Sequence, residues 1–223
     1  MPDGQYSFYL HSDDRTDIAA MATISTISQP LRGEFIRTAA TAGAVVYQVD
    51  ARLPALIPVF FAGQLSAVRL CAVMALVSGT WSSFTGLPDE PENGEAALPV
   101  SPETEYQRRR YTLTLQNGRS GERVESVLTE ASSRLRGDLL RNLIITGLAL
   151  HTTAPELPRL LASMPVPPTS VSELQALVQQ MAGTADVNRA AAAVPDTPAA
   201  SAAPVSGSDT REIKKNMRRA FGD

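Results

Sequence analysis

Two short stretches of the sequence alternate between apolar residues and residues with hydrogen-bonding side chains. Tyr6, Phe8 and Leu10 set the apolar positions of the first stretch, and residues 111, 113 and 115 set those of the second. A period of two is typical of a strand with one buried face, so the polar side chains should project from the other face. Such side chains can read the donors and acceptors on DNA base edges in the major groove. The candidate base-reading residues are Gln5, Ser7, Tyr9, His11, Arg110, Thr112, Thr114 and Gln116.

Basic residues near these stretches are candidates for phosphate contacts. Arg108 and Arg109 immediately precede the second stretch. Arg32, Arg134 and Arg136 lie at or near the start of a predicted helix, where free amides and a partial positive charge suit a phosphate. The alternative is that both outward faces are merely solvated, and this alternative is stronger for the first stretch, whose Tyr9 and His11 are less typical of base reading.

The sequence contains one unit twice. Residues 5–10 align with residues 110–115 at an offset of 105, and residues 31–37 align with residues 135–141 at an offset of 104. The match continues at Gly43 with Gly147 and in two Leu-Pro pairs further on. The small drift in offset falls in turns, where changes of length are tolerated. We therefore predict a duplicated unit.

Each copy has the same predicted plan. The strand is followed by a first helix (about residues 14–26 and 121–132), a second helix (31–47 and 135–152) and a helical extension (53–80 and 157–181). The first helix of copy one carries its apolar residues at Ile18, Met21 and Ala22. Because glycine in mid-helix costs about 1 kcal/mol, its presence at equivalent places, Gly43 and Gly147, predicts a close helix–helix approach.

A strand of six residues needs a partner, and in a strand–helix–helix unit the natural partner is the strand of another unit. The predicted fold class is therefore mainly α with short β-strands: two tandem ribbon-helix-helix units, each with a C-terminal helical extension, and then a disordered tail. The two copies could pair within one chain, or each could pair with its like in a second chain.

Composition divides the chain into five segments. Residues 1–85 and 106–182 hold the two units, and residues 86–105 form a linker with four prolines and six acidic residues. Residues 183–208 are rich in Ala, Pro, Ser and Thr, so we expect disorder there. Residues 209–223 are expected to form a short amphipathic helix that binds a partner protein, although anionic lipid, non-specific DNA contact or a frayed basic tail are alternatives.

Several function classes are disfavoured. The net charge is −3, but the acidic residues concentrate in the linker and leave basic patches elsewhere. No Cys/His cluster has metal-ligand spacing, and nothing places Ser, His and Asp together, so we expect neither a cofactor nor an enzyme. A single cysteine, a polar N-terminus and an interrupted apolar stretch at residues 53–77 favour a cytoplasmic protein without a membrane span.

The run Gln29-Pro30-Leu31-Arg32-Gly33-Glu34-Phe35-Ile36-Arg37, continuing through residues 38–47 and the turn at residues 50–54, resembles the second helix and following turn of the ParR (StbB) family. These proteins are centromere-binding adaptors of type II plasmid partition. The tail at residues 208–216 also resembles the ParR C-terminus.

The resemblance implies a ribbon-helix-helix protein that binds centromere repeats in double-stranded DNA, self-associates there, represses its own operon and engages a ParM-like actin-like ATPase filament through its C-terminus. The implied filament contacts are Ile213, Lys214, Lys215, Asn216, Met217 and Phe221. The chain departs from the family because two units share one tail, which puts the stoichiometry with the filament in doubt. A TraY-like relaxosome accessory protein and a plain ribbon-helix-helix repressor are the alternatives.

Overall fold

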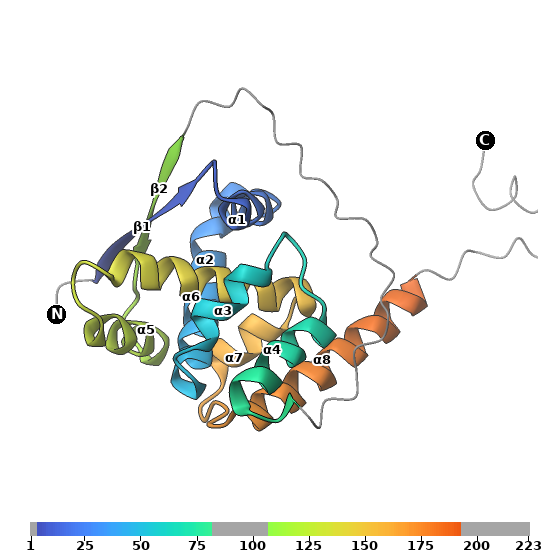
Figure 1. Ribbon diagram of the computed structural model, residues 1–223. Helices are drawn as coiled ribbons and strands as arrows, with labels where there is room; N and C mark the ends of the chain where they lie inside the picture. Colours follow the sequence, from blue (N-terminus) through green and yellow to red (C-terminus); the bar gives the residue numbers. More distant parts are fainter. Residues whose placement is uncertain (1–3, 82–106, 193–223) are drawn as a thin grey trace, which may run out of the picture. The chain divides into compact units, whose positions relative to one another are not determined.

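The structure, a computed structural model, describes residues 4–81 and 107–192, the last nine of them by their backbone alone. It is mainly helical with one short two-stranded sheet, which confirms the predicted fold class (Figure 1). The first copy contains β1 (Gln5–His11), α1 (Arg15–Ser25), α2 (Gln29–Val49), α3 (Leu53–Phe60) and α4 (Ala67–Ser78). The second contains β2 (Arg108–Thr114), α5 (Arg119–Glu130), α6 (Arg136–Thr153), α7 (Leu157–Ser163) and α8 (Val171–Ala192).

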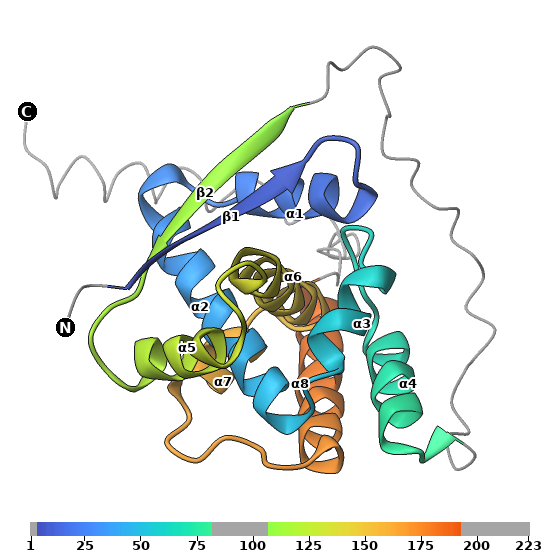
Figure 2. The same cartoon turned by 60° about the vertical axis from the view of Figure 1, so that its left-hand side comes forward.

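The two strands pair with each other inside this one chain. β1 and β2 are antiparallel, and the register runs from Gln5 opposite Thr114 to His11 opposite Arg108. The ribbon they form lies along one side of the helices, with β1 packed on α6 and β2 on α2 (Figure 2). Of the two pairing modes that the sequence left open, the structure has the one within the chain.

The centre of the fold is the crossing of α2 and α6, which is built on two glycines. A Cβ atom at Gly43 would overlap the backbone carbonyl of Leu143, and one at Gly147 would overlap that of Ala39. Leu143 and Ala39 are themselves equivalent positions of the two copies, so the crossing is symmetric. The predicted close approach of the second helices is therefore confirmed.

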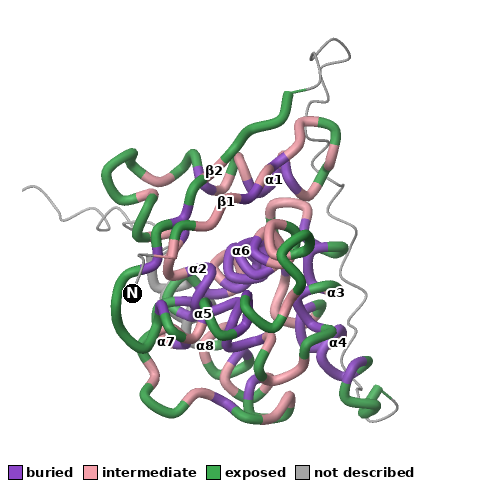
Figure 3. Tube along the Cα trace, turned by 90° about the vertical axis from the view of Figure 1, so that its left-hand side faces the viewer, coloured by how far each residue is buried: buried purple, intermediate pink, exposed green. Residues whose placement is uncertain are grey.

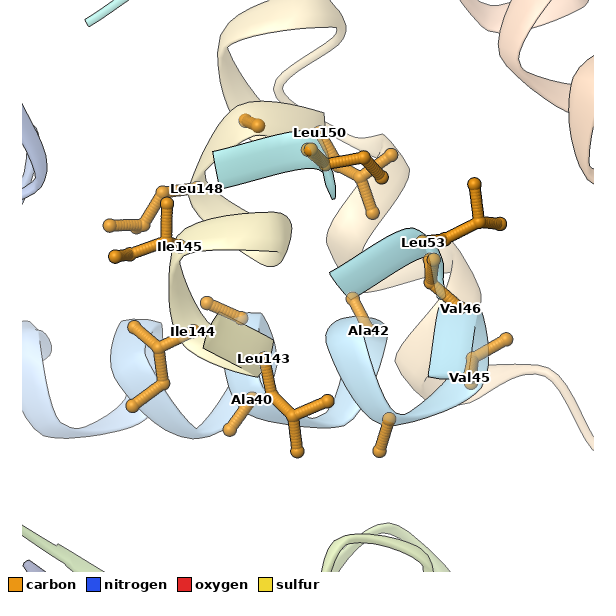
Figure 4. Close-up of a cluster of buried hydrophobic side chains, with 14 of the residues drawn as sticks. Ala40, Ala42, Val45, Val46, Leu53, Leu143, Ile144, Ile145, Leu148 and Leu150 are labelled. Atoms are coloured by element: carbon orange, nitrogen blue, oxygen red, sulfur yellow. The ribbon is translucent and has the colours of Figure 1, made fainter. Parts of the chain in front are cut away.

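Around this crossing the residues of both second helices are almost continuously buried (Figure 3). Alanine and valine on α2 meet larger aliphatic side chains on α6 (Figure 4). Small residues on one helix and large ones on the other fill the space between two close backbones. The buried side chains drawn there include Ala40, Ala42, Val45, Val46, Leu143, Ile144, Ile145, Leu148 and Leu150.

Two predictions about the helices need correction. The apolar face expected for α1 is displaced, because Ala22 is exposed while Ala19, Ala20 and Ile24 are buried. The start of the predicted disordered linker at residue 183 falls inside α8, which continues to Ala192. The boundaries expected between residues 85 and 106 lie outside the described residues.

Both copies belong to one compact unit that extends to Val187. The second unit, residues 188–223, is described only by the last turn of α8. In the part of the chain that the structure describes, no helix combines the length and the apolar character needed to cross a membrane.

Candidate nucleic-acid interface

The face of the ribbon that points away from the helices carries the predicted base-reading residues. Opposite residues in an antiparallel pair project to the same side, so each cross-strand pair places two polar side chains together. The pairs on this outer face are Gln5 with Thr114, Ser7 with Thr112, Tyr9 with Arg110, and His11 with Arg108. Arg108 and Arg109 were expected before the strand and belong to it instead. Gln116 lies two residues beyond the end of β2, exposed, at the turn into α5.

The inner face anchors the ribbon to the helices. Phe8 and Leu10 are fully buried and Leu113 is nearly so. The ring of Phe8 stacks on that of Tyr111, with centroids 5.2 Å apart. This burial raises the pKa of the Tyr111 hydroxyl above its ordinary value. An apolar underside of this kind fixes the ribbon, so that its outer face is presented as a rigid surface.

Arg110 is held in place by a cross-strand contact. Its Nε and Nη2 atoms donate to the Oγ of Ser7 at 3.2 and 2.9 Å. The guanidinium has five N–H donors, so this arrangement leaves its Nη1–Nη2 edge available on an exposed surface. A planar fork of donors is the group that binds guanine O6 and N7 in the major groove.

The other two strand arginines lie over aromatic rings on opposite faces. The guanidinium carbon of Arg108 lies 3.5 Å from the centroid of the Tyr9 ring on the outer face. Arg109, opposite Leu10, lies 5.3 Å from the Tyr111 ring centroid instead. Cation–π contacts of this kind orient a guanidinium plane without consuming its donors. The sequence placed Tyr9 among the reading residues but did not reveal that it supports Arg108.

The starts of α2 and α6 differ in the free amides that the phosphate-binding prediction requires. In α2, Pro30 has no N–H and the amide of Leu31 donates to the carbonyl of Ser28 at 3.0 Å, so α6 offers more free amides than α2. Neither helix has a side-chain hydrogen bond at its N-cap, Ser28 or Leu135. The first amides of a helix have no partner within the helix, so they can donate to an anion. The leucines at these two starts, Leu31 and Leu135, are also exposed.

The arginines predicted at these helix starts have a structural task as well. Arg32 donates from Nε to the carbonyl of Ile27 and from Nη2 to that of Ser25. Arg136, its equivalent in the second copy, donates from Nε to the carbonyl of Ala131. Both therefore tie the start of the second helix to the end of the first helix or to the turn that follows it. Arg134 is exposed beside this turn.

A buried ion pair fixes one end of the ribbon, and the sequence did not predict it. The Nε of Arg141 on α6 donates to the Asp17 carboxylate at 2.6 Å, and its Nη2 lies 3.2 Å from Asp14. The amide of His11 donates to the other Asp17 oxygen at 2.9 Å. Burial raises the pKa of the Asp17 carboxyl above its usual value, although the hydrogen bonds from His11 and Arg141 oppose this rise.

This ion pair joins the first copy to the second, and its pseudo-symmetric counterpart at the other end of the ribbon is missing. Aligned at an offset of 104, Asp14 and Asp17 correspond to Gly118 and Gly121, and Arg141 corresponds to Arg37. Arg37 instead bonds Glu34 on its own helix at 2.7 Å. Because the two aspartates occur in the first copy alone, comparison of the repeats is the signal from which the sequence could have indicated an interaction that is not repeated.

The two ends of the ribbon consequently differ in charge. A hollow of about 500 Å³ at the end with His11 contains four aspartates and two arginines. A hollow of about 310 Å³ at the opposite end contains Arg37, Arg119 and Arg159 with one acidic residue, Glu34. The duplicated halves are therefore not equivalent surfaces.

Other candidates can be placed only in part. The predicted filament contacts, Ile213 to Asn216 together with Met217 and Phe221, lie outside the described residues. Among residues 4–81 and 107–183, no group of three His, Cys, Asp or Glu side chains is arranged to hold a metal ion.

Comparison with models of known protein families assigns the chain to one family. The sequence model of a family described as plasmid stability protein matches it twice, at residues 4–74 and 109–178. The two matches cover more than half of the 223 residues. The chain belongs to the plasmid stability protein family. No curated protein and no solved structure gave a match.

The two matches to the plasmid stability protein family coincide with the two copies of the repeat. Each begins at a strand, β1 or β2, and ends within the last helix of its copy, α4 or α8. One family unit is therefore one strand and four helices. This chain contains two such units, joined strand to strand.

Proposed function

We propose that this plasmid stability protein binds double-stranded DNA by inserting the β1–β2 ribbon into the major groove, as a ribbon-helix-helix protein does. The observation that carries the proposal is the outer face of the ribbon, where Arg108 and Arg110 are oriented by cross-strand partners beside Thr112 and Thr114. A two-stranded ribbon fits the width of this groove. The uncapped starts of α2 and α6 would then meet the phosphates on either side.

We further propose that the protein is an adaptor rather than an enzyme. Its membership of a plasmid stability family and its resemblance to ParR together support a role in which it binds centromere-like repeats, self-associates on them and represses its own operon. Residues 209–223 would link the bound DNA to an actin-like ATPase filament through Ile213, Lys214, Lys215, Asn216, Met217 and Phe221. The basic, amphipathic pattern of this segment supports a helix-in-groove contact.

A relaxosome accessory protein of the TraY type is the second candidate. The observation that favours it is the pairing of both strands within one chain, since tandem copies in one chain are a feature of that class. The two candidates share the DNA-binding ribbon and differ in the protein partner. Capture of a purified actin-like filament or of a purified relaxase by the DNA-bound protein would discriminate between them.

The base-reading assignment is tested by Thr114→Ala. Thr114 is exposed on the outer face of β2, opposite Gln5. We expect the substitution to weaken binding to the cognate repeat by about 1–3 kcal/mol and to leave binding to random duplex DNA unchanged. Fluorescence anisotropy with both duplexes measures the two affinities. The matched control is Thr129→Ala, since Thr129 is an exposed threonine on α5, away from the ribbon. Equal losses on both duplexes would show that Thr114 reads no base.

The adaptor role is tested by deleting residues 209–223. We expect the truncated protein to bind DNA as tightly as the full chain, because the ribbon and both second helices remain, and to fail in plasmid segregation. Plasmid retention over generations without selection measures the second property. Normal retention with the truncated chain would refute the proposed role of this segment.

A further inference from the structure

We infer that one molecule of this protein reads a DNA site without two-fold symmetry, in which guanines are contacted in one half and adenine–thymine pairs in the other. The inference rests on the proposed function and names the kind of DNA that the ribbon would accept. It follows from the way two different strands meet at a common centre.

The centre of the ribbon is the pair of Ser7 with Thr112. At the offset of 105 that relates the strands, Ser7 is equivalent to Thr112, and these two residues are also direct cross-strand partners. The pseudo-two-fold axis therefore passes between them. The outer pair next to the centre, Tyr9 with Arg110, has its counterpart on the far side of this axis, whereas the position equivalent to Arg108 lies outside the described residues.

One half of the outer face presents guanidinium groups. The Tyr9–Arg110 and His11–Arg108 pairs lie on this side of the axis. The Nε–Nη2 side of Arg110 is bonded to Ser7, and the guanidinium carbon of Arg108 lies over the ring of Tyr9. Both side chains are thus restrained before DNA binds, with donor edges left over. Guanine, which offers two acceptors in the major groove, is the base that such donor-only forks select.

The other half presents different chemistry at the equivalent positions. The counterpart of the Tyr9–Arg110 pair is the Thr114–Gln5 pair, and Gln116 is the counterpart of His11. A glutamine amide both donates and accepts, which matches adenine, and the threonine methyl group matches the methyl group of thymine. The one outer pair of this half that the structure describes, Gln5 with Thr114, contains no arginine.

This difference has a direct consequence for the site. When two identical chains pair, their equal halves favour a palindromic sequence. Here the paired strands differ in sequence, so the half-sites should differ as well. The protein would then bind in one orientation, and a series of binding sites would be read as direct rather than inverted repeats.

The experiment is a selection of duplexes from a randomised library with the full-length chain. The expected consensus has unequal halves, with guanines confined to one of them. Arg110→Lys keeps the charge but loses the planar fork, so the selected consensus should lose its guanine preference in that half alone. On the selected duplex, we expect the discrimination between guanine and adenine at that position to fall about ten- to a hundredfold. Thr114→Ala should change the consensus only in the opposite half.

The possible outcomes separate the inference from the function beneath it. A palindromic consensus, or changes in both halves from Arg110→Lys, would overturn the inference and leave DNA binding intact. A chain whose circular dichroism spectrum shows it to be folded, but which neither binds duplex DNA nor enriches a sequence, would overturn the proposed function and the inference with it.

Discussion

Replacing Gly43 with alanine is expected to separate α2 from α6 and to lower the free energy of unfolding. Overpacking a core typically costs about 1–3 kcal/mol, and we expect a loss at least this large. The added methyl group would overlap the backbone carbonyl of Leu143, which cannot rotate away as a side chain can. Relief therefore requires the two helices to move apart along their whole contact. Because the ribbon rests on both helices, we also expect its strands to lose their fixed register.

Denaturation by urea, followed by circular dichroism, measures this effect. Gly33→Ala is the matched control, since Gly33 is exposed on the same helix and a Cβ there would have only an Arg37 nitrogen nearby, at 3.7 Å. Alanine has the higher helix propensity, so the control should be more stable by up to about 1 kcal/mol. If Gly43→Ala stabilised the protein as much as Gly33→Ala, the close approach of α2 and α6 at Gly43 would be contradicted.

Replacing Asp17 with alanine is expected to cost about 3–5 kcal/mol of folding free energy, the range for a buried ion pair that loses one partner. The Asp17 side chain is 1% exposed and that of Arg141 is 20% exposed. Without Asp17, the guanidinium keeps only Asp14 and Asn142 as partners, and the amide of His11 loses its acceptor. The end of β1 should therefore loosen together with α1.

Thermal and urea unfolding measure the loss, and hydrogen exchange at the His11 amide localises it. Because burial raises the pKa of Asp17, the folded chain disfavours its charged form more than the unfolded chain does, so Asp17→Asn should cost less than Asp17→Ala. The matched control is Arg37→Met, which breaks the more exposed Arg37–Glu34 pair within α2 and should cost less than about 1 kcal/mol, because Arg37 is the residue equivalent to Arg141. Equal costs for Asp17→Ala and Arg37→Met would contradict the buried position of the first pair.

The internal repeat was the strongest source of correct predictions. Comparing the copies placed the strands, the second helices and the glycines at 43 and 147, because features that occur twice at one offset are constrained by the same packing. Alternation of polar and apolar residues correctly separated the outer and inner faces of the ribbon, since the side-chain period of a strand is fixed at two. The alternation is a local pattern, and the repeat compares one local pattern with another.

The remaining features depend on contacts between distant residues. The partner of β1 could not be chosen from its own pattern, since β2 of the same chain and β1 of another present similar edges. Arg32 and Arg136 were predicted to contact phosphate from their position alone, whereas their hydrogen bonds to the preceding helix arise from the turn geometry. The ion pair between Asp17 and Arg141 joins residues 124 positions apart in different copies, and the equivalent positions, Gly121 and Arg37, form no such pair, so no repeated pattern indicated it.

The pairing of β1 with β2 inside one chain also bears on how the protein responds to its own abundance. A ribbon assembled from two separate chains dissociates on dilution, because its folded population depends on the concentration of subunits. Here the ribbon and the helices beneath it form in a unimolecular step, tethered by the segment between α4 and β2. The ribbon is therefore complete in a single molecule at any expression level. If the protein binds DNA as proposed, gene dosage would change how many DNA sites are filled without changing whether the binding surface exists.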